Sequence, residues 1–271
     1  MTPALSTSPL STPSPIAAFL DYGVKKTLHK WAARAASKVA RRDGRDVVTS
    51  RYGVRMRANW RDRTFQYCRY ATYGRVLSGY LAAQERPFGF VDIGANQGLY
   101  SLLAARNPQC VGVTAFEPVA ATFALLRDNI ALNGAEAHIR PVHAAVSLQS
   151  GMATIATDTA HSGVASLRDT AATGVGEDIR ILGITGVDTL LPPDAPLIVK
   201  IDVEGHEETV VEALIASMHR DRIASLFYEV DSRWTDAAAI ESRLRAAGFG
   251  RFDRFGIGRH YDILARRAAT T

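Results

Sequence analysis

The sequence predicts an α/β fold built on a doubly wound, mostly parallel sheet. Short apolar strands alternate with helices from about residue 88 onward, which is typical of parallel sheets. One strand runs into a glycine-rich turn that opens a helix, and a later strand is fully apolar until it ends in ionisable residues. A chain of 271 residues with 47% apolar content can bury a full core. Disorder throughout is therefore excluded.

The segment before the sheet is expected to be a helical extension. Residues 1–15 are rich in Ser, Thr and Pro and are predicted to be disordered. Apolar side chains then recur at three- and four-residue steps among basic ones, which predicts a basic amphipathic helix over 16–42. A short hairpin over 47–57 and a helix over 65–84 follow. These features predict an extension over 16–86 and a main domain over 87–271.

The elements of the main domain are predicted from the spacing of its apolar residues and from its turn residues. Residues 151–184 are polar and weakly alternating, which predicts an antiparallel excursion or a loop that closes over a site. Two short strands are expected at the C-terminus. The remaining elements are strands over 89–93, 111–116, 139–146, 197–203 and 223–230, and helices over 99–106, 119–133, 207–217 and 237–247.

Charge is unevenly distributed along the chain. Residues 1–75 carry fifteen Lys and Arg against four Asp and Glu, a net of +11, whereas residues 76–271 carry seventeen against twenty-three, a net of −6. A basic segment on an acidic body suggests an anionic partner such as a membrane surface. The alternative is a basic helix face packed on the acidic body.

No targeting or framework signal is found in the sequence. No apolar run approaches the roughly 18 residues of a membrane-spanning helix, and no basic stretch precedes an apolar one at the start. Two cysteines, Cys68 and Cys110, cannot form a disulfide framework and are expected to be buried or half-buried thiols. We therefore expect a cytoplasmic protein.

The first chemical motif is the turn from Asp92 to Gly98, with the sequence DIGANQG. Glycines there permit a tight turn and close approach of a ligand to backbone N–H groups. Asn96 stands where a dinucleotide-binding turn has its second glycine, the one that seats a pyrophosphate. A side chain at that place, together with the Asp92 carboxylate, favours a cationic ligand without phosphates.

Two further motifs end neighbouring strands. Glu117 follows the second strand, 23 residues after Gly94, where an acidic residue can accept both ribose hydroxyls of an adenosine ligand. The strand 197–203 leads into five ionisable groups within eight residues: Lys200, Asp202, Glu204, His206 and Glu207. Because unpaired buried charges cost several kcal/mol each, this cluster favours a functional site.

These motifs, in this order, resemble the FkbM family of S-adenosylmethionine-dependent methyltransferases. The resemblance runs from about Gly89 to Glu229 and rests on VDIGANQG, AFEP, DNIALNG, HAAVS, VDTLL, VKIDVEGHE and FYEV. It implies a class I methyltransferase fold with an antiparallel last strand, S-adenosylmethionine as the cofactor, and methyl transfer to oxygen. The usual acceptors of similar proteins are hydroxyls of sugars, glycolipids, polysaccharides or natural products.

The resemblance and the residues together imply a division of roles. The methionine part and sulfonium of the cofactor would lie on the glycine turn, the ribose on Glu117, and the adenine against two small residues. The residues expected to bind the cofactor are Asp92, Gly94, Ala95, Asn96, Gly98, Glu117, Ala144 and Ala145.

The same reasoning assigns the acceptor end of the site. A hydroxyl is a poor nucleophile until a base takes its proton. Asp202 is expected to have the central role, Glu204 or His206 to assist, and Lys200 to tune the local charge. No metal is required, although Asp202, Glu204 and Glu229 could bind a divalent cation. The other six histidines, including His260, have no ligand spacing and are expected to be structural.

Three alternatives remain open from the sequence. The first is a lipid-linked acceptor, with residues 16–42 contacting an anionic membrane. The second is a cofactor-binding module without turnover, which the carboxylate cluster disfavours. The third is nucleic-acid methylation, suggested only by the basic N-terminal part. A nucleic-acid partner is not expected, because the Pro-Pro-aromatic signature of amino methylation does not follow the strand 197–203.

Overall fold

The computed structural model describes residues 45–156 and 176–268. The expected disordered segment 1–15, the basic helix 16–42 and the centre of the expected lid lie outside the described residues. Within the described part of the chain, no helix has both the length and the apolar character needed to cross a membrane.

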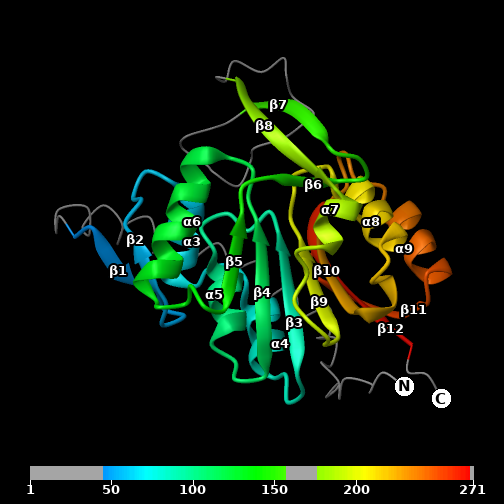
Figure 1. Cartoon of the computed structure of the whole chain (residues 1–271), viewed down its shortest axis with the longest axis horizontal. Coiled ribbons are helices and arrows are strands. Elements are labelled where there is room, and N and C mark those ends of the chain that lie inside the picture. Colours follow the sequence, from blue (N-terminus) through cyan, green and yellow to red (C-terminus); the bar gives the residue numbers. More distant parts are fainter. Residues whose placement is uncertain (1–44, 157–175, 269–271) are drawn as a thin grey trace.

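A seven-stranded sheet forms the centre of the molecule and confirms the predicted fold class (Figure 1). Its strand order is β5-β4-β3-β9-β10-β12-β11, and every neighbouring pair is parallel except the two made by β12. The expected antiparallel last strand is therefore β12, which lies between β10 and the edge strand β11. The strands are β3 (Phe88–Ile93), β4 (Cys110–Phe116), β5 (Ile139–Val142), β9 (Leu197–Ile201), β10 (Ile223–Asp231), β11 (Phe249–Phe255) and β12 (His260–Arg267).

Helices cover both faces of this sheet, which is why its central strands are apolar on both sides. Alternate residues of β3 enter different cores: Phe88 and Phe90 pack with one helical layer, and Val91 and Ile93 with the other. The first layer contains α3 (Arg63–Tyr70), α4 (Arg75–Ala82), α5 (Leu99–Ala105) and α6 (Ala120–Leu132). The second contains α7 (Ile184–Asp188), α8 (Glu207–Ala216) and α9 (Ala237–Ala246).

The predicted helix over 65–84 is wrong as a single element. Asp62 caps α3 by accepting from the N–H groups of Thr64 and Phe65. Ala71 then takes a left-handed conformation with φ 51°, and Gly74 follows with φ 87°. Because left-handed residues end α-helices, the chain turns there and restarts as α4. The predicted hairpin is confirmed as β1 (Val47–Thr49) and β2 (Arg55–Arg57).

The predicted strand over 139–146 is also divided. Its first half is β5, at the edge of the main sheet, and its second half is β6 (Ala145–Ser147), which pairs with β8 (Gly176–Gly183). β7 (Gly151–Ala156) joins the other side of β8 in antiparallel pairing, as predicted for this region. In Figure 1 this small sheet lies beyond the ends to which the arrows of β3, β4 and β5 point.

Candidate active site

One cavity of about 540 Å³ lies at the carboxyl ends of the central strands. Between β3 and β9 the strand order reverses, since the chain runs from β3 outward to β5 and later from β9 outward to β10. Ligands of open α/β sheets bind at such a switch point. The cavity is lined from β3, β4, β9, β10 and β12, from α3, and from the small sheet.

The glycine turn forms the floor of this cavity. Gly94 and Ala95 donate their N–H groups to the carbonyl of Phe116, which joins the ends of β3 and β4. A Cβ atom on Gly94 would lie 1.9 Å from the carbonyl oxygen of Asp202, so only glycine permits this approach. Asn96 has φ 51° and lines the cavity, as expected.

Glu117 lies beside the turn, as the sequence predicts. Its carboxylate accepts from the N–H of Asn96 at 2.9 Å and from the N–H of Val119 at 3.0 Å. Burial raises the pKa of Glu117 to about 7, against the effect of these two hydrogen bonds. The carboxylate is thus fixed by the backbone at the cavity wall.

An apolar compartment adjoins Glu117. Ala144 and Ala145 line it, as the sequence predicts, at the point where the chain passes from β5 to β6. The small sheet adds Ile155 from β7 and Ile179 from β8, which pack together with Val119. The described part of the expected lid therefore forms a wall of the cavity.

Two of the expected cofactor ligands do not line the cavity. Asp92 is fully buried, and its Oδ2 accepts from the backbone N–H and the hydroxyl of Ser101. Gly98 has φ 86° and begins α5. Both residues support the turn from outside the cavity, and Asp92 is connected to the site by its ion pair with Lys200.

Lys200 connects the two halves of the site. Its ammonium lies 3.3 Å from Asp92 and 3.5 Å from Asp202, and it donates to the carbonyl of Gly94. Burial disfavours its charged form, but the charges of Asp92 and Asp202 prevail and raise the pKa of Lys200. A buried ammonium therefore holds the glycine turn against the end of β9.

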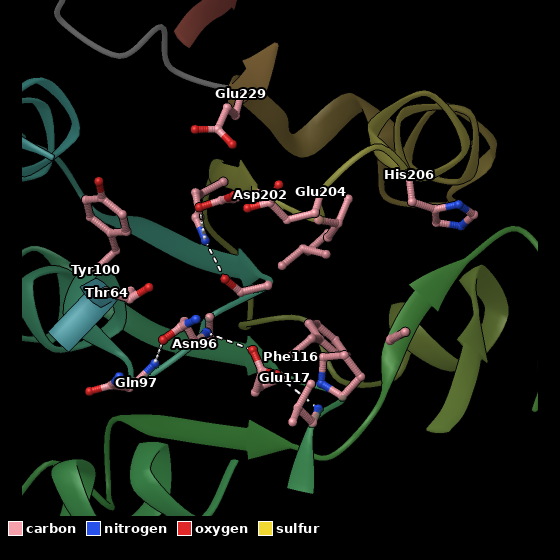
Figure 2. Close-up of a pocket in the computed structure, with 18 of the residues that line it drawn as sticks. Thr64, Asn96, Gln97, Tyr100, Phe116, Glu117, Asp202, Glu204, His206 and Glu229 are labelled. Carbon is pink, nitrogen blue, oxygen red and sulfur yellow. Dashed lines mark hydrogen bonds and ion pairs between the residues drawn. The ribbon is translucent and has the colours of Figure 1, made fainter. Parts of the chain in front are cut away.

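The structure brings Asp202 and Glu204 together with Glu229 of β10 (Figure 2). The chain leaves the strand geometry after Ile201, and Glu204 has φ 50°, so the expected alternation along one extended strand does not continue. Carboxylate oxygens of the three residues lie within 4.8 Å of one another. Burial and the charge of Asp202 raise the pKa of Glu204 to about 9, so this carboxyl holds a proton at neutral pH.

His206 lies apart from these carboxylates. It lines the cavity, but its Nε2 lies 3.2 Å from the hydroxyl of Ser147 in β6. Figure 2 shows its ring directed away from Asp202 and Glu229.

Sequence reasoning missed His260, which it treated as structural. His260 begins β12, lines the cavity and places its Nε2 2.6 Å from Glu229. The hydrogen bond to Glu229 is the main cause that raises its pKa to about 9. No local spacing could reveal this pair, because it depends on the antiparallel insertion of β12 beside β10. Tyr73 was also missed; its hydroxyl lies 3.5 Å from Glu229.

Comparison with known proteins gives one family match. The model of the methyltransferase FkbM domain matches residues 92–250, more than half of the chain. No curated protein matches the sequence.

Solved structures provide distant likenesses. A methyltransferase FkbM from Methylobacillus flagellatus KT is 16% identical, over 76% of this chain and 53% of its own, with a TM-score of 0.48. A precorrin-6y C5,15-methyltransferase from Geobacter metallireducens GS-15 is 14% identical over 72% and 87%, with a TM-score of 0.42. A ribosomal protein L11 methylase from Lactobacillus delbrueckii subsp. bulgaricus is 14% identical over 70% and 77%, with a TM-score of 0.41.

Proposed function

Since this chain belongs to the FkbM family of S-adenosylmethionine-dependent methyltransferases, we propose that it methylates a hydroxyl group of a sugar, glycan, glycolipid or natural product. The observation that carries the proposal is the carboxylate cluster of Asp202, Glu204 and Glu229. It lines the same cavity as the glycine turn and Glu117. A module that only binds the cofactor has no need of such a cluster.

The cavity fits S-adenosylmethionine in its chemistry. Glu117 offers a carboxylate for ribose hydroxyls, and the compartment with Ala144, Ile155 and Ile179 is apolar enough for adenine. The turn carries the Asn96 side chain at the place where a dinucleotide-binding turn has the glycine that seats a pyrophosphate. The sulfonium would lie over the turn, on the side of Asp202. Bound there, the cofactor supplies an electrophilic methyl group.

The chain's own residues must align the acceptor and take its proton. In the transfer, the acceptor oxygen forms a bond to the methyl carbon while the bond from that carbon to sulfur breaks, and the hydroxyl proton leaves. Alignment of this kind contributes up to about 7–11 kcal/mol. The proposed proton acceptor is Asp202, because it lies beside the Lys200 ammonium at the end of β9.

The neighbours of Asp202 have supporting parts in this proposal. Glu204 holds a proton at neutral pH and can donate a hydrogen bond to the acceptor. Glu229 pairs with His260, which places a cation on the far side of the cluster. His206 assists only indirectly, because its Nε2 is directed toward Ser147.

Titration calorimetry with S-adenosylhomocysteine tests the cofactor end. Wild type is expected to bind, and Glu117→Ala is expected to bind at least about tenfold more weakly, because a charge-assisted contact is lost. Glycans and hydroxylated natural products would then be screened with a labelled methyl donor. Label recovered on nitrogen or carbon, and not on oxygen, would contradict the proposed reaction.

We also propose a cytoplasmic location with peripheral contact at an anionic membrane surface, carried by the charge of residues 1–75. Flotation with vesicles of phosphatidylcholine, with and without phosphatidylglycerol, tests the contact. The full chain is expected to float only with the anionic lipid and to be released by salt. A chain that starts at residue 43 is expected to remain at the bottom. Equal flotation of both chains would refute the role of residues 16–42.

A further inference from the structure

Gln97 lines the cavity and carries a buried, unsatisfied side-chain oxygen. The residue is 1% exposed and lines the cavity, yet its Oε1 has no hydrogen-bond partner among the described residues. Buried polar atoms are nearly always satisfied, so an orphan acceptor at a binding cavity indicates a missing donor.

The orientation of the Gln97 amide is fixed by Asp62. The Nε2 group of Gln97 donates a short hydrogen bond to Asp62, which is itself fully buried as the N-cap of α3. A flipped amide would place Oε1 against the Asp62 carboxylate, and two acceptors would then repel each other. Oε1 is therefore the free end.

The Gln97 backbone is held as firmly as its side chain. Its carbonyl accepts from the buried amide of Asn129 at 2.8 Å, and its N–H donates to Asn96 Oδ1 at 2.9 Å. These contacts therefore fix the position of Gln97 Oε1 before any ligand binds.

Gln97 lies at the end of the cavity remote from the nucleoside compartment. Figure 2 shows Gln97 and Thr64 on one side of Asn96, with Phe116 and Glu117 on the other. A cofactor whose ribose meets Glu117 and whose sulfonium lies over the turn would extend its amino-acid end toward Gln97. That end offers one strong donor, the α-ammonium group, and one acceptor, the carboxylate.

We propose that Oε1 of Gln97 accepts a hydrogen bond from the α-ammonium of S-adenosylmethionine, and that Asp62 is the positioning residue that aims it. Segment 60–73, which precedes the matched family region, would thereby complete the methionine end of the cofactor site. The inference rests on the cofactor placement proposed above and is independent of the acceptor class.

Three thioether ligands distinguish the contributions of the ammonium and the carboxylate to binding. S-Adenosylhomocysteine has the ammonium and the carboxylate, its decarboxylated analogue keeps only the ammonium, and 5′-methylthioadenosine has neither. For Gln97→Met, calorimetry is expected to show at least about tenfold weaker binding of the first two and less than about twofold change for the third. Asp62→Ala should give the same selective loss, because it removes the carboxylate that accepts from Nε2 of Gln97 and so fixes the orientation of the amide.

Two controls make the result specific. Gln66→Met alters a glutamine of α3, the helix capped by Asp62, whose Nε2 donates to the carbonyl of Trp60, and should leave all three affinities unchanged. Glu117→Ala should weaken the binding of all three ligands, because all three contain the ribose. If it does not, the proposed placement of the nucleoside is wrong, and this failure is distinguishable from a failure of the Gln97 contact.

The outcomes decide the proposal. Selective loss of the two ammonium ligands in both variants supports it. Unchanged binding in Gln97→Met, parallel loss of all three ligands, or loss of S-adenosylhomocysteine without loss of the decarboxylated analogue would overturn it.

Discussion

At the scale of single residues, Asp202 carries the sharpest prediction. Its carboxylate lies 3.5 Å from the Lys200 ammonium and close to Glu204 and Glu229. Asp202→Asn keeps the shape but removes the proton acceptor, so turnover is expected to fall by about 10²- to 10⁴-fold. The affinity for S-adenosylhomocysteine should change less than about threefold, because the proposed cofactor contacts of Glu117 and the turn are not altered. Turnover close to wild type would exclude Asp202 as the base.

Glu117 predicts a pH dependence of cofactor binding. Burial raises its pKa to about 7, and its charged form is the better acceptor for ribose hydroxyls. The association constant for S-adenosylhomocysteine is therefore expected to rise by up to about tenfold per pH unit below pH 7 and to level off above it. Glu117→Gln should bind weakly with no such slope, and calorimetry at several pH values measures both.

The same pKa fixes the sign of a stability effect. Because the pKa of Glu117 in the folded protein lies above its ordinary value of 4.5, the stability that Glu117 contributes is full below about pH 4.5 and is lost as the pH rises through about 7. Without ligand, the wild type should therefore lose unfolding free energy through this window relative to Glu117→Gln. If urea denaturation gives the two proteins the same dependence of unfolding free energy on pH, the raised pKa of this carboxyl is contradicted.

At the scale of elements, the site depends on how closely the turn after β3 approaches the end of β9. Gly94→Ala would press a Cβ atom against the carbonyl of Asp202 at φ +74°. We expect loss of S-adenosylhomocysteine binding and a fall in unfolding free energy of at least about 2 kcal/mol. Gly134→Ala is the matched control, because Gly134 has φ +63° with open space around it and should cost only about 1 kcal/mol. Equal effects would show that strain alone, and not the contact, decides.

The elements that the sequence predicted well are those whose signals are local. The strand ending at Ile93, its glycine turn and Glu117 are short-range patterns, and the structure places them together as expected. The strand over 197–203 was predicted from its run of apolar residues, and the structure has this strand but ends it at Ile201, two residues earlier. These signals come from burial and turn geometry, which neighbouring residues determine.

The elements that the sequence mispredicted depend on distant partners. The strand over 139–146 divides because Ala145 pairs with Ile181 in another sheet, a contact that no local pattern encodes. The helix over 65–84 divides at Ala71, whose left-handed conformation has no signal in an alanine. Gly74 was the residue in the sequence that could have indicated this break in the helix. His260 was missed for the same reason, since only the pairing of β12 with β10 brings it to Glu229.

At the scale of the whole molecule, the site is formed jointly by the first helical layer and by the ends of the sheet strands. The first helical layer supplies Thr64 from α3 and Tyr73 from the segment after it, whereas the strand ends supply Asp202 and Glu229. The sheet alone would therefore leave the cavity open on one side. Residues 45–86 share a core with β3, which explains how this part of the chain is held at the site.

The charges gathered around the cavity predict that catalysis needs no divalent cation. The carboxylates of Asp92, Asp202 and Glu229 face the cations Lys200 and His260, while Glu204 holds a proton. These six groups, with Glu117 at the other end of the cavity left aside, therefore sum to a net charge near −1, which complements the single positive charge of a sulfonium. A bound divalent cation would also displace the proton of Glu204, so the group would become neutral and would no longer complement the charge of the methyl donor.

The corresponding measurement is methyl transfer after exhaustive chelation. We expect the rate to stay within about twofold of the untreated enzyme, because Lys200 and His260 already pair with two of the carboxylates that a cation would have to bind, Asp202 and Glu229. Loss of activity on chelation, restored by Mg²⁺ or Mn²⁺, would show that Asp202, Glu204 and Glu229 bind a metal ion. In that case the protonated state of Glu204 would also be displaced, since metal ligation requires the deprotonated carboxylate. Lys200→Met separates the two models. If no metal takes part, this variant loses the buried cation that lies beside Asp202, so turnover should fall and added Mg²⁺ should not restore it.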